Sequence, residues 1–376
     1  MKRCSVGVLQ EGNKVYYYIQ DSDTLEIALL PTKYLKYKIE SNRSPNTVKR
    51  SAYALCYYMD YMTEVALDFQ GVCQLSYDEQ NRHFVGFLYW IKEGNHLSEV
   101  ADEDNNQRIT GNGTCNAYLK DVFRFFLYLC DHGYAPALKV LSYNQITVPN
   151  AVGVKRVLRS RSFKGYLKER ERNVRAAEEP EILEFLQACT NCRDQLLILL
   201  IAETGFRIGE ILGVDYTRDI DYRNHTIRVF FRDDNENGAR AKNAEYRRAK
   251  ISDDTFCFLL HYLSEYREVL QYQTYLFINI VGDTMGRPLK VDSVYDMLDR
   301  VEKKTGIKMT PHMIRRYFGN ARWNAGWPLE LISQAYGHKH LDTTIRYLNI
   351  LDDKLMEASK EFYSRHSVNY GIDNLL

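Results

Sequence analysis

The sequence predicts a mainly α-helical protein with a small β-sheet or hairpin, an α+β fold divided into two domains. The chain has 376 residues, enough at roughly 100–200 residues per domain for two or three domains. Apolar residues recur at helical spacing in both halves, and a stretch near residue 230 alternates apolar and polar residues as a strand does. With 45% hydrophobic and 26% charged residues, the composition is that of a globular protein and excludes wholesale disorder.

Residues 1–30 are predicted to form a short β meander, because Gly-Asn and Asp-Ser-Asp separate their apolar and aromatic runs. A helical domain is predicted over residues 31–140, with a helix that begins with Ser44 as its N-cap and Pro45 as its first residue. Glu99–Asn106 is expected to be an exposed loop of this domain. Two apolar faces at helical spacing mark its core: Val48, Ala52, Leu55, Met59 and Met62 on one helix, and Leu119, Val122, Phe123, Phe126 and Cys130 on another.

The second domain is predicted over residues 177–376. A helix is expected to begin at Glu179 and Pro180, and the run QLLILLIAETG that follows is typical of a buried helix. The chain from Ser293 onward is expected to be mostly helical. Between them a β-hairpin is predicted, in which the polar turn DDNENG joins the returning run YRRAKIS to a strand with the alternating apolar residues Ile227, Val229 and Phe231.

The charge of the chain is concentrated in one segment. The 50 Lys and Arg against 49 Asp and Glu give a net charge of +1, which by itself argues against nucleic-acid binding. Residues 1–150 carry 15 basic and 17 acidic residues, and residues 176–376 carry 26 and 30. The segment from Lys155 to Arg175, however, contains nine basic residues and only two acidic ones, both glutamates. This segment lies in a predicted interdomain linker, residues 141–176, and is either a solvated linker or a connector that contacts a polyanion and releases its counterions.

Other features exclude several classes of protein. The N-terminus lacks the apolar segment of a secretory signal, and the longest strongly apolar run, Leu196–Ala202, is far shorter than a membrane span. We therefore expect a cytoplasmic protein with no membrane partner. Eight cysteines are too dilute for a disulfide scaffold, and the pair Cys189 and Cys192 has no second pair at zinc spacing, so no metal site is predicted. The motifs GxxxxGK[ST] and GxGxxG are absent, and no cofactor is expected.

Four short pieces of the second domain are unusual in combination. In chain order they are TGFRIGE at 204–210, PHMIR at 311–315, YGH at 336–338, and Tyr347 nine residues after the histidine. In the second piece, His312 and Arg315 are three residues apart, so on a helix they share a face and can address one group. Each piece alone has an ordinary explanation: a tyrosine in packing, a histidine bonded locally, an arginine paired with the glutamate that follows it.

In this order and spacing, the pieces resemble the catalytic signature of the tyrosine recombinase (phage integrase) family. The resemblance spans most of residues 177–365 and extends more weakly over 31–135, where SPNTVKRSAYAL and AYLKDVFRFFLYL are similar to that family's helical core-binding domain. It implies a two-domain C-shaped clamp around double-stranded DNA, with the core-binding and catalytic domains on opposite faces of the duplex. It also implies a homo-oligomer, a tetramer on two DNA sites, in which the C-terminal tail docks on a neighbouring protomer; self-docking of that tail is the alternative.

The resemblance implies a role for six residues. Arg207 and Arg315 fall on the two phosphate-binding arginines, His312 and His338 on two histidine positions, Lys242 on the hairpin lysine, and Tyr347 on the nucleophile. For the lysine, Lys250 on the returning run of the hairpin is the alternative. The chain departs from the family at Arg316, where His is frequent, and at Tyr336, where Leu is usual before Gly-His. Neither position carries a required chemical step, so we expect altered packing there rather than inactivity.

Phosphodiester chemistry explains these residue types. A guanidinium forms paired hydrogen bonds to phosphate oxygens and keeps its charge. A free phenol with a pKa near 10 is about one part in a thousand ionised at pH 7, a deficit of roughly 4 kcal/mol that neighbouring cations and a base can reduce. By the resemblance, His312 is that base, Lys242 protonates the leaving 5′-oxygen, and His338 donates a hydrogen bond to the phosphate. The covalent 3′-phosphotyrosine stores the bond, so a 5′-hydroxyl can reverse the step without ATP or metal.

The predicted function is site-specific recombination, the integration or excision of a mobile element by an integrase or transposase. Two alternatives remain open: a type IB topoisomerase, which shares the chemistry but relaxes DNA without exchanging partner sites, and a DNA-binding relative that has lost the reaction. The N-terminal meander either binds separate arm sites on DNA or braces the helical domain. Basic residues of the linker are expected to contact DNA phosphates, namely Lys155, Arg156, Arg159, Arg161, Lys164 and Lys168.

Overall fold

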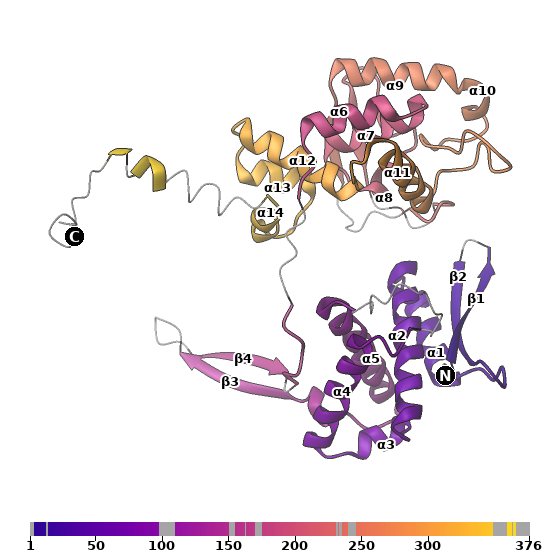
Figure 1. The fold of residues 1–376 in the computed structure, drawn as a ribbon, viewed down its shortest axis with the longest axis vertical. Helices are drawn as coiled ribbons and strands as arrows, with labels where there is room; N and C mark the ends of the chain where they lie inside the picture. Colours follow the sequence, from indigo (N-terminus) through magenta and orange to yellow (C-terminus); the bar gives the residue numbers. More distant parts are fainter. Residues whose placement is uncertain are drawn as a thin grey trace. The chain divides into compact units, whose positions relative to one another are not determined.

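The computed structural model describes residues 4–12, 14–97, 110–149, 155–161, 163–169, 175–230, 232, 235–239, 246–348, 359–362 and 364–365. The chain divides into two compact units, Met1–Glu171 (unit 1) and Arg172–Leu376 (unit 2) (Figure 1). Both units are mostly helical, and their described strands form small antiparallel sheets, which confirms the predicted α+β class. The predicted loop Glu99–Asn106 and most of the C-terminal tail lie outside the described residues.

Unit 1 begins with a β-hairpin that packs on its helices. In this hairpin Cys4 lies opposite Asp21, and an isolated bridge joins Gln20 to Ile27. Its inner face is part of the core of the unit, because Ile19 is fully buried and the backbone N–H of Cys4 donates a hydrogen bond to Asp60 (2.9 Å). The described elements of unit 1 are β1 (Cys4–Glu11), β2 (Lys14–Asp21), α1 (Leu29–Glu40), α2 (Pro45–Glu64), α3 (Phe69–Gln74), α4 (Tyr77–Lys92), α5 (Asn112–Asp131), η1 (Lys139–Leu141), β3 (Tyr143–Pro149) and β4 (Lys155–Arg161).

The core of unit 1 lies between α2, α4 and α5. Helix α2 begins as predicted, since the Ser44 hydroxyl accepts a hydrogen bond from the backbone N–H of Thr47 (3.4 Å) and Pro45 is the first helical residue. Its predicted apolar face is buried, with Met59 partly covered. The centre of this core is aromatic, because the ring of Tyr58 lies 5.1 to 6.1 Å from those of Phe84, Phe87 and Phe126. Replacing one of these phenylalanines by alanine is expected to lower the free energy of unfolding by about 3–5 kcal/mol.

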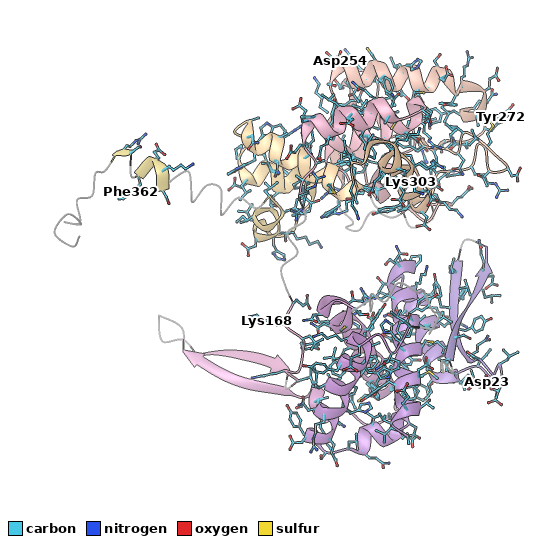
Figure 2. All side chains as sticks on the ribbon, viewed as in Figure 1. Asp23, Lys168, Asp254, Tyr272, Lys303 and Phe362 are labelled. Atoms are coloured by element: carbon cyan, nitrogen blue, oxygen red, sulfur yellow. The ribbon has the colours of Figure 1, made fainter. Side chains whose placement is uncertain are left out.

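The segment predicted as a basic linker, residues 141–176, forms structure of its own. In its first part β3 pairs with β4 in an antiparallel hairpin with Ile146 opposite Leu158. The β-branched residues Ile146, Thr147 and Val148 of β3 favour extended backbone, a signal that the basic residues obscure in the sequence. Its second part, residues 163–169, packs on unit 1: Phe163 is buried in the core, and the side chain of Asn116 donates a hydrogen bond to the carbonyl of Leu167 (2.8 Å). Within this second part, Lys164 and Lys168 are exposed, and Figure 2 shows Lys168 at the surface of the unit.

Unit 2 contains the predicted helix and hairpin. The strand alternation is confirmed over β6, whose Val229 lies opposite Arg247 of β7, whereas Phe231 and much of the polar turn lie outside the described residues. The described elements of unit 2 are α6 (Glu179–Ala188), α7 (Cys192–Thr204), α8 (Ile208–Ile211), β5 (Ile220–Asp221), β6 (Thr226–Val229), β7 (Arg247–Lys250), α9 (Asp253–Glu265), α10 (Arg267–Leu270), α11 (Val291–Thr305), α12 (Pro311–Asn324), α13 (Leu329–Tyr336) and α14 (Leu341–Leu348).

Helix α7 is the buried centre of unit 2. It packs against α9 and α12, which explains why it is apolar on nearly all sides. The helix ends at Gly205, whose φ of +61° is a conformation that favours glycine. A Cβ at Gly205 would lie 2.5 Å from the ring of Phe318 on α12. Gly205 therefore permits α7 and α12 to approach closely, two residues before Arg207 in the chain.

Candidate active site

Arg207 lies between the end of α7 and the start of α8, where Glu210 holds it. The backbone N–H of Arg207 donates to Oε2 of Glu210 (2.7 Å), and its guanidinium donates to Oε1 (2.9 Å). The carboxylate is buried, whereas 24% of the Arg207 side chain is accessible. Glu210 therefore holds both the backbone and the guanidinium of Arg207, while part of this side chain stays accessible to solvent.

Helix α12 presents His312 and Arg315 from its first two turns. The Thr310 hydroxyl caps this helix by accepting a hydrogen bond from the backbone N–H of Met313 (3.3 Å), and a proline follows the cap. Arg315 is 3% exposed and donates hydrogen bonds to the carbonyls of Gly205 and Tyr336, the second at 2.8 Å. His312 is exposed. One helix thus supplies a buried, fixed cation and an accessible imidazole.

His338 follows the end of α13 through a left-handed glycine, Gly337, with φ of +63°. Its Nδ1 lies 2.9 Å from the hydroxyl of Thr344 on α14. Its ring stacks on that of Tyr336 with centroids 5.0 Å apart. The turn, the hydroxyl and the stacked ring together fix the orientation of the imidazole.

Tyr347 lies on α14 among these groups. Its hydroxyl is 3.2 Å from Nδ1 of His312, and its ring meets those of His312 and His338 nearly edge-on, with centroids 4.9 and 5.4 Å apart. The guanidinium carbons of Arg316 and Arg315 lie 4.7 and 6.0 Å from its ring centre. The phenol is therefore surrounded by two imidazoles and two guanidinium groups.

The electrostatics of the site reflect burial beside several positive charges. Burial raises the pKa of Tyr347, and Arg315, Arg316 and Arg207 offset part of that rise. Burial, followed by the repulsion from Arg315 and Arg207, lowers the pKa of His338 to about 3, so this imidazole is neutral at pH 7. Burial also lowers the pKa of Arg315 to about 10, which leaves it charged.

Glu210 is the carboxylate that balances these cations. Burial by itself would raise the pKa of Glu210, but Arg247, the backbone N–H of Arg207 and the charges of Arg207 and Arg315 outweigh burial and lower it. Arg315 Nη1 lies 4.0 Å from Oε2 of Glu210. One buried negative charge therefore faces three arginines, and the site carries a surplus of positive charge of the kind that attracts an anion.

Five of the six residues assigned by resemblance meet in this cluster. They are Arg207, His312, Arg315, His338 and Tyr347, brought from the N-cap of α8, from α12 and α14, and from the turn after α13. The sixth, Lys242, lies outside the described residues. Lys250, its alternative, is an exposed residue at the end of β7. Of the predicted DNA-contacting residues of the linker, Lys155, Arg156, Arg159 and Arg161 are described in their backbone, where they belong to β4.

Sequence reasoning missed the contribution of two further residues. Arg247 on β7 forms an ion pair with Glu210 and donates to the carbonyl of Ala335 (2.9 Å). Tyr336, where altered packing was expected, is fully buried between Arg315 and the rings of the site. The sequence showed a basic run, RRAK, on the second strand of the hairpin and an aromatic residue before Gly-His. Neither pattern indicates which groups these side chains contact.

Metal and membrane sites have no support among the residues that the structure describes. Within the described ranges, no group of three or more His, Cys, Asp or Glu is placed to hold a metal ion. Burial raises the pKa of the Cys189 thiol to about 12, and this thiol donates a hydrogen bond to the carbonyl of Phe185 (3.3 Å). Among the described helices, none has both the length and the apolar character to cross a membrane.

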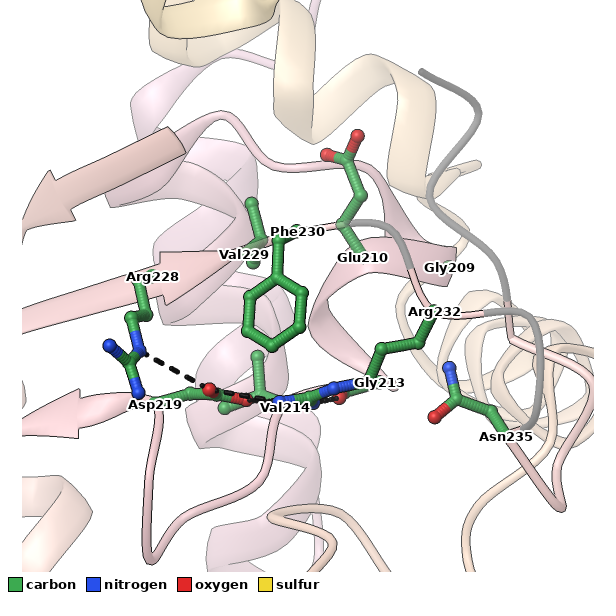
Figure 3. Close-up of a pocket in the computed structure, with 10 residues that line it drawn as sticks. All are labelled: Gly209, Glu210, Gly213, Val214, Asp219, Arg228, Val229, Phe230, Arg232 and Asn235. Carbon is green, nitrogen blue, oxygen red and sulfur yellow. Dashed lines mark hydrogen bonds and ion pairs between the residues drawn. The ribbon is translucent and has the colours of Figure 1, made fainter. Parts of the chain in front are cut away.

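A small cavity beside Glu210 has a structural explanation (Figure 3). Its volume of about 10 Å³ is room for roughly one water molecule. Arg228 and Arg232 on its wall both bind Asp219, at 3.4 and 2.7 Å. Its arginines are therefore already paired, and the cavity is too small for a substrate. The five described residues that the resemblance assigns lie outside this cavity, in the cluster around Tyr347.

Comparison with known proteins identifies the family. The model of the phage integrase family matches residues 172–354. The chain is 30% identical over 338 residues to transposase A from transposon Tn554 of Staphylococcus aureus, a match that covers 89% of this chain and 90% of the relative. It is 32% identical over 201 residues to the tyrosine recombinase XerA of Saccharolobus solfataricus, covering 53% of this chain and 61% of the relative.

The fold of solved structures agrees with these matches. A crystal structure of the XerH site-specific recombinase in a post-cleavage complex with its difH substrate aligns with a TM-score of 0.56 at 17% identity, over 83% of this chain and 78% of that chain. The Tn1549 transposon integrase with transposon right-end DNA aligns with a TM-score of 0.56 at 13% identity, over 90% and 98% of the two chains. From the family match and the near full-length relative, we conclude that this chain belongs to the phage integrase family and is a tyrosine recombinase, an enzyme that cuts and rejoins DNA.

Proposed function

We propose that this protein recombines the ends of a mobile element by transesterification through a covalent 3′-phosphotyrosine at Tyr347. The observation that carries the proposal is the 3.2 Å approach of the Tyr347 hydroxyl to Nδ1 of His312, next to Arg315. The near full-length match to a transposase supports the mobile-element part of the proposal. His312 and Arg207 are accessible, as an extended polymeric substrate requires.

The first step forms one bond and breaks one bond. The Tyr347 oxygen attacks the scissile phosphorus while its proton passes to His312, and the bond from phosphorus to the 5′-oxygen of the next nucleotide breaks. The product is a phosphotyrosine linked to a DNA 3′-end and a free 5′-hydroxyl. A phenol whose pKa is raised by burial needs this base in contact with it, because little phenolate is present at pH 7.

Arg207 and Arg315 stabilise the negative charge that develops on the phosphate. Arg315 is held by two backbone carbonyls and Arg207 by Glu210, so neither guanidinium has to reorganise when the substrate enters. Such preorganised donors commonly account for the largest part of the catalysis of reactions in which charge develops. His338, neutral at pH 7, donates a hydrogen bond to a phosphate oxygen.

Lys242 is the proposed acid that protonates the leaving 5′-oxygen. Its support is its place in the hairpin sequence, five residues before Arg247, which is itself in contact with the Glu210 carboxylate. In the second step a 5′-hydroxyl from the partner DNA attacks the phosphotyrosine and gives its proton to Lys242, the phosphorus–tyrosine bond breaks, and Tyr347 takes its proton back from His312. No oxidant, metal or nucleotide is needed to balance either step.

The protein acts on double-stranded DNA, and we propose a tetramer on two recombination sites in the bacterial cytoplasm or nucleoid. The linker residues Lys155, Arg156, Arg159, Arg161, Lys164 and Lys168 are proposed to contact DNA phosphates. Lys164 and Lys168 are exposed, as this role requires. Recombination is favoured over topoisomerase activity because the transposase match extends through both units rather than the catalytic unit alone.

The test uses a nicked suicide duplex made from the ends of the host element. Wild type is expected to form DNA–protein adducts that survive SDS, and Tyr347→Phe is expected to form none. Tyr295→Phe, an exposed tyrosine on α11, is the matched control and should form adducts at the wild-type rate. No adduct with wild type would support the inactive relative. Relaxation of supercoiled plasmids without a recombination site, and no strand exchange between two sites, would support the topoisomerase.

A further inference from the structure

Arg247 is a buried cation that connects the two loops of the candidate active site. It is the first residue of β7, and its side chain is 9% exposed. One end of its guanidinium, Nη2, forms an ion pair with Oε1 of Glu210. The other, Nη1, donates to the carbonyl of Ala335 (2.9 Å) near the end of α13. A single planar group therefore joins the strand, the start of α8 and the turn before His338.

The surroundings of Arg247 leave it little freedom to move. Its guanidinium carbon lies 5.3 Å from the ring centre of Phe206, the residue directly before Arg207. On the other side, a Cβ at Gly337 would lie 2.8 Å from Nε and 3.0 Å from Cζ of Arg247. The turn that carries His338 thus closes directly onto the guanidinium, and Gly337 is required both for that contact and for its φ of +63°.

Glu210 transmits this restraint to the arginine predicted to bind phosphate. The same Oε1 that pairs with Arg247 accepts the hydrogen bond from Arg207 (2.9 Å). Without Arg247, the carboxylate keeps its bonds to Arg207 but loses its connection to α13. The carbonyl of Ala335 loses a donor at the same time, three residues before His338. The expected consequence is a looser arrangement of Arg207 relative to His338, with the ion pair at α8 retained.

We propose that Arg247 is a positioning residue for DNA cleavage, which holds Glu210 and the His338 turn in a fixed position relative to β7. This inference rests on the proposed function. The guanidinium acts through its geometry as well as its charge, because two nitrogens of one fork reach two different segments. A lysine at this position keeps the charge but replaces the planar fork by a single ammonium nitrogen, which reproduces the geometry of the two contacts less well. Arg247 itself does not touch the substrate.

The test compares Arg247→Met, Arg247→Lys and the control Arg248→Met. Arg248 is the next residue of β7, is exposed, and has the same charge to lose. Each full-length variant is assayed for single-turnover adduct formation on saturating nicked duplex, for duplex affinity and for thermal unfolding. We expect Arg247→Met to cleave about 100-fold more slowly, as misplacements on the order of 1 Å produce, with a duplex affinity within about 3-fold of wild type. Arg247→Lys should recover part of the rate, and Arg248→Met should cleave like wild type.

The outcomes separate this inference from the proposed function. If wild type forms adducts and folded Arg247→Met forms them at the wild-type rate, Arg247 has no positioning role and the proposed function stands. If the cleavage rate of Arg247→Met falls only as much as its folded fraction does, and Arg247→Lys recovers none of the rate, then Arg247 serves stability alone and the proposal is wrong. If wild type forms no adducts, the proposed function itself fails before the variants are compared.

Discussion

Arg315 and Tyr336 exchange two hydrogen bonds between α12 and α13. Nη2 of Arg315 donates to the carbonyl oxygen of Tyr336 (2.8 Å), and the Tyr336 hydroxyl donates to the carbonyl oxygen of Arg315 (2.7 Å). The guanidinium carbon also lies 4.6 Å from the Tyr336 ring centre. Because the same ring contacts His338 and Tyr347, one residue at which the chain departs from the family pattern touches three of the predicted catalytic groups.

Removing the Tyr336 hydroxyl should weaken this connection. We expect Tyr336→Phe to lower the free energy of unfolding by about 1 kcal/mol, the net value of one hydrogen bond. Tyr336→Leu, which restores the residue usual in the family, should cost about 3 kcal/mol or more, because it also leaves a cavity among packed rings. Urea unfolding measures both effects, and single-turnover cleavage should fall in the same order. A Tyr336→Leu variant as stable and active as wild type would contradict this account of the site.

Glycine at position 205 should be required by packing as well as by backbone conformation. Gly205→Ala places a Cβ 2.5 Å from Phe318 at a φ of +61°, so we expect it to destabilise unit 2 by at least about 2 kcal/mol and to impair cleavage. Gly306→Ala is the matched control: it also ends a helix at positive φ, +74°, but no heavy atom lies within 4 Å of its Cβ. Its cost should be about 1 kcal/mol. Equal costs for the two variants would show that the contact with Phe318 is unimportant.

Stability should fall in mild acid because two histidines, one buried and one partly buried, stay neutral in the folded protein. Burial and the neighbouring arginines lower the pKa of His338 to about 3, and burial lowers that of His83 to about 4. In the unfolded chain both histidines bind a proton near pH 6.5. The free energy of unfolding is therefore highest above about pH 7 and decreases as the pH falls toward about 4. Urea unfolding from about pH 7.5 to 4.5 should show a shallower decrease in His338→Gln than in wild type. The same slope in both proteins would mean that His338 titrates normally.

The linker cations should set the salt dependence of DNA binding. Replacing Lys155, Arg156, Arg159 and Lys164 by alanine should weaken binding to every DNA sequence. It should also reduce the slope of log affinity against log salt by about one unit for each phosphate that the segment no longer neutralises. A variant with Lys303 and Lys304, at the end of α11, replaced by alanine removes two positive charges outside the segment and shows how much of the effect follows from net charge. A salt slope unchanged by the linker substitutions would show that the segment does not contact the DNA backbone.

Local signals predicted several elements of both units. The Ser44 cap, the strand at Ile227 and the buried run that became α7 were visible because capping and periodicity are properties of neighbouring residues. The strands β3 and β4 were missed because nine basic residues in their neighbourhood outweighed a weaker β-branched signal. The chemistry was predicted from a resemblance rather than from any single residue, each of which had an ordinary explanation.

Long-range contacts could not be predicted in this way. Arg247 is 88 residues from Ala335, to which it donates a hydrogen bond, and Arg315 is 110 residues from Gly205. No pattern within a segment specifies such partners, because they depend on how α7, α12, α13 and β7 pack together. The same reasoning explains why Tyr336 was expected to affect packing alone, although its hydroxyl and ring lie against the arginine and histidine of the site.

The most direct test of the central claim is to identify the amino acid that becomes attached to DNA. Wild-type adducts on a nicked suicide duplex are trimmed with nuclease, digested with trypsin and analysed by mass spectrometry. We expect the nucleotide mass on the peptide that begins at Tyr347, which follows Arg346, with the nucleotide on the tyrosine oxygen. A nucleotide attached to any other residue, such as Tyr336, or adducts that persist in Tyr347→Phe, would contradict it.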